Sequence, residues 1–380
     1  MTLWIRTHPR LVFLLFYALF LLAIEAGLHQ WWVDGAPSTD GGNIVPDALV
    51  HHDYRPNISF TTKPYMGDSF PPTHNQINAL GLRGPIPTAK KNRRILLLGD
   101  SFVQADEVHF AQTFGQQLNV HFAPQLDFVA HGMVSWSPTT EFSWLHHKGL
   151  ALAPDEVVLF LCINDFYRPA AFHQTDTIYR RQAVYEGELP ISYSLPTPSL
   201  TRRAIEHSAL LRLLHLGYRS MRLALRPPTK NSAPTIPSEI LHLAQPQDKW
   251  PSALRANVDS TLAVVAAINR YLHRRGILLH TTLVPLPFAW PDECALGKQH
   301  PLYAWSADFS VSQAGIEKHV RTRMAQQDIG WIDLHAAFVT AKQSEDALLF
   351  NEVDGHWNAA GHRIVFGALR NYFTESKSRE

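Results

Sequence analysis

The sequence predicts an α/β protein with a mainly parallel, doubly wound sheet and helices on both of its faces. Several continuous apolar runs are too short for helices and suit strands that are buried on both faces. Helical patterns separate these runs, such as the pattern over residues 254–274. Strands that alternate with helices at this spacing are typical of a doubly wound sheet. The expected strands cover residues 95–98, 126–130, 157–161, 277–284 and 330–334.

The first of these strands ends at a candidate nucleophile. Arg93 and Arg94 lead into the apolar residues 95–98, and Gly99 then allows a tight turn because it has no Cβ atom. Ser101 therefore lands at the carboxyl end of the strand, where open α/β sheets build their sites. We predict that its hydroxyl is a catalytic nucleophile. The alternative is a turn serine that satisfies local backbone groups.

An aspartate and a histidine stand just before the last predicted helix. Asn358 suits the N-cap of that helix, His356 lies in the preceding loop, and Asp354 comes two residues earlier. A histidine placed this way takes a serine proton and returns it to the leaving group, while the carboxylate stabilises the imidazolium. The alternative is a capped turn rich in polar residues. The helix itself is indicated by the spacing of Ile364, Val365, Ala368, Leu369, Tyr372 and Phe373.

Three short motifs, far apart in the chain, resemble those of the SGNH or GDSL hydrolases: GDSF at 99–102, CIND at 162–165 and DGHWN at 354–358. The resemblance implies a flavodoxin-like α/β fold. It also implies that Ser101 is the nucleophile, His356 the base and Asp354 the carboxylate that orients the base. The segment NQINALGLRGP, residues 75–85, resembles the lead-in to GDSF in bacterial members of this group.

The same resemblance assigns Gly132, in AHGMVSWSP, and Asn164, in CIND, to the oxyanion hole. This assignment is physically sound, because a tetrahedral intermediate needs preformed N–H donors aimed at its developing charge. Gly132 follows the strand predicted over residues 126–130 and would offer its backbone N–H. Asn164 follows residues 157–161 and would offer its side-chain amide. Taken singly, the glycine also suits an ordinary turn and the asparagine a strand-end cap, but the shared order of the motifs favours the oxyanion role.

Two features depart from the usual family pattern. Cys162 replaces the glycine of the third motif, which puts the local backbone conformation in doubt more than the chemistry. The last motif has the spacing D-x-H instead of the commoner D-x-x-H. This shorter form resembles the branch that contains alginate O-acetyltransferases and related polysaccharide acyl-modifying proteins. The spacing therefore leaves both hydrolysis and acyl transfer open.

The amino terminus carries an apolar run over residues 11–28 that only Glu25 interrupts with a charge. A helix over these residues would be about 27 Å long, just enough to cross a bilayer core. We predict an uncleaved transmembrane anchor in a bacterial inner membrane; a cleaved signal peptide is the alternative. Arg6 and Arg10 before the run place the N-terminus in the cytoplasm, and the rest of the chain in the periplasm or outside the cell.

The composition argues against several classes of function. The net charge of +1 over 380 residues argues against nucleic acid as a partner. The chain has no CxxC pair and no HExxH motif, and its 21 histidines are scattered, so we predict no metal and no cofactor. Cys162 and Cys294 permit one disulfide in an oxidising compartment but do not require it.

An insertion, residues 166–250, separates the two halves of the predicted core and is expected to form a cap. Residues 179–185 and 189–193 indicate a hairpin. Residues 200–225 indicate a helix with five arginines and a single acid; its basic face is either solvated or lies on anionic lipid or an acidic polymer. The predicted domains are a stub and anchor (1–32), a lead-in segment (33–92), the core (93–165 and 251–375) and the cap (166–250).

These observations together predict a serine esterase of the SGNH type that is anchored in the membrane and acts on O-acyl esters, chiefly O-acetyl esters. An envelope or secreted polysaccharide, or a lipid, is the expected substrate on the grounds of compartment and resemblance. A polysaccharide O-acetyltransferase with the same triad is one alternative. A catalytically silent scaffold or glycan-binding protein is another. We favour the esterase because nothing in the sequence identifies an acyl donor.

Overall fold

The computed structural model describes residues 8–34, 43–64, 70–90, 92–167, 182–194, 200–201, 208–224, 238–290, 293, 312–344, 347–352 and 354–377. The chain divides into two compact units. The larger unit contains residues 43–195 and 233–380, and the smaller contains residues 1–42 and 196–232. Each unit is described by itself.

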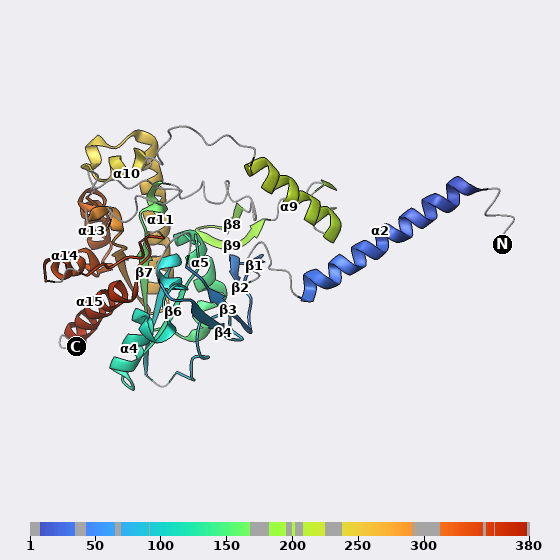
Figure 1. Ribbon diagram of the computed structural model, residues 1–380. Coiled ribbons are helices and arrows are strands. Elements are labelled where there is room, and N and C mark those ends of the chain that lie inside the picture. The colour runs from blue at the N-terminus through green and yellow to red at the C-terminus, as the bar shows by residue number, and fades with distance from the viewer. Residues whose placement is uncertain are drawn as a thin grey trace. The chain divides into compact units, whose positions relative to one another are not determined.

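A five-stranded sheet forms the centre of the larger unit (Figure 1). The strand order is β11-β10-β7-β5-β6, and each neighbouring pair is parallel. After β5 the chain adds β6 on one side and then β7 on the other, so a topological switch point lies at the carboxyl end of β5. The predicted α/β fold with a mainly parallel sheet is confirmed. The strands are β5 (Arg93–Gly99), β6 (Leu126–Gly132), β7 (Glu156–Leu161), β10 (Leu278–Leu283) and β11 (Gly330–Trp331).

Burial on both faces explains why β5 and β7 are apolar without alternation. Residues 95–98 of β5 are completely inaccessible to solvent, and residues 157–161 of β7 are at most 1 % exposed. Helices cover such strands in parallel sheets. In one group of contacts α4 (Phe114–Phe122) packs against β6 and α15 (Ala359–Lys377). In another, α11 (Ser252–His273) packs against α5 (Pro138–His147) and β10.

The helices of the larger unit begin and end close to their sequence signals. The one predicted over residues 254–274 is α11 (Ser252–His273), and the last helix is α15 (Ala359–Lys377). Asn358 caps α15 as predicted, because its Oδ1 accepts from the backbone N–H groups of Ala360 and Gly361 at 2.8 and 3.1 Å. The others are α3 (Ser101–Gln104), α4 (Phe114–Phe122), α5 (Pro138–His147), α6 (Asn164–Tyr167), α10 (Ser238–Leu243), α13 (Ala314–Ala325) and α14 (Leu334–Ser344), with short 3₁₀ turns η1 (Phe110–Gln112), η2 (Gly149–Leu152), η3 (Gln247–Lys249) and η4 (Pro287–Ala289).

The lead-in segment forms two antiparallel strand pairs that the sequence did not predict. β1 (Ile44–Asp47) pairs with β2 (His51–Tyr54), and β3 (Ile58–Thr62) pairs with β4 (Thr73–Ile77). Polar contacts tie them to the core: Lys148 forms ion pairs with Asp47 at 2.9 Å and Asp53 at 2.8 Å. β2 has no apolar face, and its buried residues have polar partners instead. The hydrophobic pattern of the sequence therefore does not predict this strand.

The predicted hairpin is present. β8 (Gln182–Glu186) pairs antiparallel with β9 (Leu189–Ser194), while residues 179–181 lie outside the described residues. The hairpin joins the lead-in segment, since the Tyr193 backbone N–H donates to the Ala48 carbonyl at 2.7 Å. The division into a core and a cap over residues 166–250 stays a prediction.

The smaller unit contains α2 (Pro9–Asp34) and α9 (Ala209–Ala224). Glu25 of α2 caps α9: its carboxylate accepts from the Ser208 hydroxyl at 2.9 Å and from the Ala209 and Leu210 backbone N–H groups at 2.6 and 3.0 Å. Negative charge is favourable at a helix N-terminus, where N–H groups lack partners. The helix predicted over residues 200–225 is thus present in its second half, while residues 202–207 lie outside the described residues.

The transmembrane anchor predicted over residues 11–28 is not confirmed. α2 covers this segment. Within the residues that the structure describes, however, no helix is long and apolar enough to cross a membrane. The charge of Glu25, which interrupts the apolar run, is used for capping α9. The structure does not describe four side chains at the start of the predicted span, those of Leu11, Val12, Leu14 and Leu15.

Candidate active site

Ser101 is presented by the turn at the end of β5. Asp100 caps the short helix α3 by accepting from the Phe102 backbone N–H at 3.0 Å, and Ser101 is the first residue of that helix. The Val103 and Gln104 backbone N–H groups donate to the Asp100 carbonyl at 3.1 and 3.0 Å. The turn is therefore rigid, and the half-buried Ser101 stands at the switch point of the sheet.

His356 and Asp354 complete a connected triad with Ser101. The His356 Nε2 and Ser101 Oγ atoms are 2.7 Å apart, and His356 Nδ1 is hydrogen-bonded to Asp354 Oδ2. Because an ionised carboxylate only accepts hydrogen bonds, Nδ1 carries the proton and Nε2 can accept the hydroxyl proton of Ser101. In the sequence, His356 is 255 positions from Ser101 and 2 positions from Asp354, and the structure brings the three residues together.

The loop that carries the imidazole is anchored on both sides. The Asn351 backbone N–H donates to the His356 carbonyl at 2.8 Å, and the Trp357 indole N–H donates to the Pro285 carbonyl at 3.1 Å. The Phe102 ring packs on the imidazole with centroids 4.7 Å apart. The side chains of His356 and Asp354 are 21 % and 24 % exposed, so both are in contact with solvent.

The charges around His356 favour its protonated form. Burial lowers the pKa of His356, but the negative charges of Asp354, Glu107 and Asp100 outweigh burial and raise the pKa to about 10. This arrangement stabilises the imidazolium form of His356 relative to the neutral imidazole. The neutral imidazole that can accept the proton therefore becomes more abundant as the pH rises towards that pKa.

Gly132 and Asn164 lie at the ends of the two strands that flank β5. Gly132 closes β6 and is in register with Gly99, and Asn164 begins α6 just after β7. A Cβ atom on Gly132 would lie 2.4 Å from the Asp100 carbonyl oxygen, so only a glycine brings this backbone so close to the turn that carries Ser101. The half-buried Asn164 has an Oδ1 atom without a hydrogen-bond partner in the described part of the chain. Both residues thus border the switch point, as an oxyanion role requires.

Three buried acids lie behind this edge of the sheet. Burial raises the pKa of Asp100, Glu141 and Asp165, and repulsion from Asp100 raises the pKa of Glu141 and Asp165 further. Cys162, the departure from the family glycine, is a buried free thiol, and Cys294 lies outside the described residues.

Glu107 is a further acid at the site, and the sequence reasoning missed it. One carboxylate oxygen of Glu107, one of Asp354 and a ring nitrogen of His356 all lie within 4.8 Å of one another. Burial raises the pKa of Glu107 to about 7, with repulsion from Asp354 and Asp106 acting in the same direction and attraction to His356 opposing it. The group is close enough to hold a metal ion, but Ser101 and Asp354 already engage both ring nitrogens of His356. An acid in a loop is too common to stand out in one sequence.

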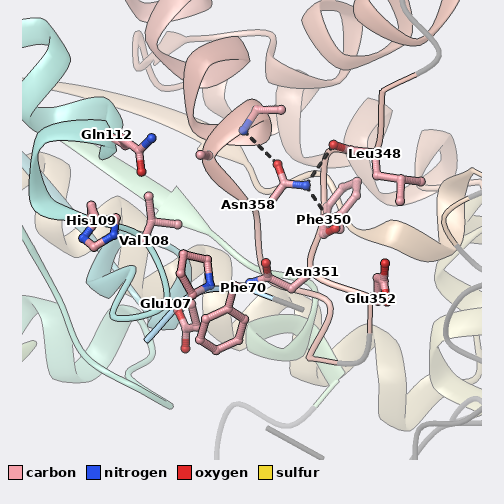
Figure 2. Close-up of a pocket in the computed structure, with 13 residues that line it drawn as sticks. Phe70, Glu107, Val108, His109, Gln112, Leu348, Phe350, Asn351, Glu352 and Asn358 are labelled. Atoms are coloured by element: carbon pink, nitrogen blue, oxygen red, sulfur yellow. Dashed lines mark hydrogen bonds between the residues drawn. The ribbon is translucent and has the colours of Figure 1, made fainter. Parts of the chain in front are cut away.

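Glu107 also forms part of the wall of a pocket of about 340 Å³ (Figure 2). Phe70, Asn351 and Asn358 also line the pocket, and Asn358 donates to the Leu348 and Phe350 carbonyls at 2.8 and 3.2 Å. Asn358 thus links the cap of α15 to the loop that leads towards Asp354. The pocket reaches the surroundings of the triad at Glu107.

No protein-family model matches the sequence, and no curated protein matches it. Solved structures that resemble the chain include an acetyl xylan esterase, AlAXEase, with a TM-score of 0.40 and 12 % identity over 73 % of this chain and 98 % of that one. A member of the lipolytic G-D-S-L family from Veillonella parvula has a TM-score of 0.37 and 9 % identity over 74 % and 98 % of the two chains. A GDSL-like lipase from Bacteroides thetaiotaomicron has a TM-score of 0.38 and 9 % identity over 75 % and 89 %. At these scores, the activity of the chain has to be inferred from its own side chains.

Proposed function

We propose that the protein is a serine esterase of the SGNH type that cleaves O-acyl esters, chiefly O-acetyl esters, through an acyl-serine intermediate. The observation that carries this proposal is the hydrogen-bonded series Ser101–His356–Asp354 at the switch point of the sheet. Gly132 and Asn164 border the same point from the neighbouring strands. The distance of 2.7 Å between the Ser101 hydroxyl and a His356 nitrogen favours an enzyme over a catalytically silent scaffold, because a scaffold does not require this contact.

The reaction begins when Ser101 Oγ bonds to the ester carbonyl carbon and its proton passes to His356 Nε2. The π electrons of the carbonyl move to its oxygen, and the N–H donors of the oxyanion hole stabilise that charge. When the intermediate collapses, the bond to the substrate alcohol breaks and the alcohol oxygen takes the proton from Nε2. Water then attacks the acyl-serine by the same steps, which releases the acid and restores Ser101.

The D-x-H spacing of Asp354 and His356 supports a polysaccharide O-acetyltransferase as the second candidate. Hydrolysis and transfer share the acyl-serine intermediate and differ in whether water or a glycan hydroxyl attacks it. We expect the larger unit, in the full chain, to release acetate from an aryl acetate. Acetate release that a panel of envelope glycans leaves unchanged, with no acetylated glycan by mass spectrometry, supports the esterase. Acetyl groups diverted to a glycan establish transfer instead, and neither product would favour the silent scaffold.

We also propose that the N-terminal segment directs the catalytic unit out of the cytoplasm. The proposal is supported by the apolar run over residues 11–28 and by Arg6 and Arg10 before it. A reporter enzyme that works only outside the cytoplasm, fused after Glu380, is expected to be active. Deleting residues 1–32 should abolish its activity. A reporter that is active only in its cytoplasmic form would overturn this proposal.

A further inference from the structure

The lead-in segment holds the loop that follows the nucleophile helix. Arg83 donates through its guanidinium to the carbonyls of Ala105 and Val108. Asn75 Nδ2 donates to the Asp106 carbonyl at 3.1 Å. These two residues belong to the motif NQINALGLRGP, which the sequence associates with GDSF but which takes no part in the triad. Its residues therefore serve to fix the backbone on both sides of Glu107.

Further contacts complete this clamp. The Tyr54 hydroxyl donates to the Asp106 carboxylate, and Gln104 Nε2 donates to the other oxygen of that carboxylate at 3.0 Å. The Thr73 hydroxyl donates to the carbonyl of Glu107 itself at 3.1 Å. Tyr54, Asp106 and Gln104 are buried. A loop with so many of its polar groups satisfied by buried partners is rigid, and it places the Glu107 side chain reproducibly.

The clamp delivers a second carboxylate to His356. Asp354 approaches the imidazole from its own loop, whereas Glu107 approaches from the loop after α3. Asp106 also faces Glu107, and Asp100 faces the imidazole from the β5–α3 turn. The guanidinium of Arg83 interacts electrostatically with both Asp106 and Glu107, and the buried His362 interacts with the imidazole from α15. The imidazole is thus surrounded mainly by negative charge.

We propose that Glu107 is a positioning residue of the catalytic centre: its carboxylate, close to His356 and Asp354, stabilises the imidazolium that forms when Ser101 attacks. This inference rests on the proposed serine mechanism. It assigns a role to the lead-in motif: the motif places Glu107 beside the triad. Asp354 remains the direct hydrogen-bond partner of His356.

The first test is the pH dependence of Glu107→Gln. Since the Glu107 charge raises the pKa of His356, its removal lowers that pKa, and the neutral base appears at lower pH. We expect the acid limb of the kcat/KM profile on an aryl acetate to move down by about one pH unit and the plateau to fall about tenfold. Glu317→Gln is the matched control, because burial also raises the pKa of Glu317 to about 7, on α13, in an environment of Asp333 and Arg321. A Glu107→Gln profile that superimposes on those of the wild type and the control overturns the proposal.

A second measurement does not depend on turnover. The imidazole signal of His356 in the proton NMR spectrum, identified by its loss in His356→Ala, is titrated in the wild type and in Glu107→Gln. A lower titration midpoint in the variant supports the proposal even if the tested esters are not substrates. An unchanged midpoint in a folded variant contradicts it. Failure of the proposed function would appear separately, as a lower midpoint in Glu107→Gln together with a wild type that hydrolyses no ester.

A double-mutant cycle with Asp354→Asn tests whether the two carboxylates act together. Because Glu107 still faces the imidazole, Asp354→Asn should retain part of the activity, and adding Glu107→Gln should cost about ten- to a hundredfold more, beyond its cost in the wild type. Losses that simply multiply would show that Glu107 acts independently of the triad.

Discussion

Ser101→Ala is expected to reduce ester hydrolysis by several orders of magnitude, on the order of 10⁴-fold or more, while the protein stays folded. The Ser101 hydroxyl is hydrogen-bonded to His356, and its removal leaves no side-chain oxygen at this position to form the acyl intermediate. The side chain is half-buried at the start of α3, where alanine is well tolerated. The measurement is acetate release from an aryl acetate, with circular dichroism to establish folding.

The histidine partner supplies the matching control. His356→Ala should lose about as much activity as Ser101→Ala, and the double variant should be hardly worse, because the two residues transfer a single proton. Labelling by a fluorophosphonate should mark the wild type and fail in all three variants. Comparable turnover in folded Ser101→Ala would remove the serine mechanism, and multiplicative losses would show that the two residues do not work as a pair.

Gly132→Ala is expected to impair both stability and activity. The new Cβ atom would lie 2.4 Å from the Asp100 carbonyl oxygen, 2.7 Å from Val103 Cβ and 2.8 Å from the Gln104 backbone nitrogen. Two of these atoms are backbone, so the nucleophile turn or the end of β6 has to move. We expect a stability loss of about 1–3 kcal/mol, as for an overpacked core. Displacement of the oxyanion donor relative to Ser101 should add a fall in kcat of about 10²-fold or more.

Gly367→Ala is the matched control for that substitution. Gly367 lies in α15, and a Cβ atom there would meet no other atom within 4 Å. Alanine is the better helix former, so this variant should keep full activity and equal or higher stability in a denaturant titration. If Gly132→Ala behaves like Gly367→Ala, the close approach of β6 to the nucleophile turn has no catalytic consequence.

The core strands and the triad could be predicted from sequence because each has a local signal. Buried parallel strands are continuous apolar runs, and β5 and β7 are such runs. Ser101 directly follows one of them, and His356 directly precedes a helix that Asn358 caps. Since the carboxyl ends of parallel strands meet at one edge of the sheet, such local positions suffice to bring distant residues together.

The lead-in strands and Glu107 had no comparable signal. β2 is buried although its sequence is HHDY, because Asp53 forms an ion pair with Lys148 and lies 3.2 Å from the Nε2 atom of His131, both from the core. Glu107 stands in a short loop whose conformation depends on Tyr54, Asn75 and Arg83, all far earlier in the chain. Hydrophobic periodicity carries no information about such polar pairings between distant segments.

By itself, the sequence determined the α/β class, the order of the core strands along the chain and the identity of Ser101, His356 and Asp354 as candidates. These follow from patterns that extend over a few residues, where burial and capping act locally. Only the tertiary structure decided that Glu25 caps α9, that Gly132 touches the nucleophile turn and that Glu107 faces the imidazole. Each of these depends on distances between segments that are far apart in sequence, and such distances exist only once the chain has folded.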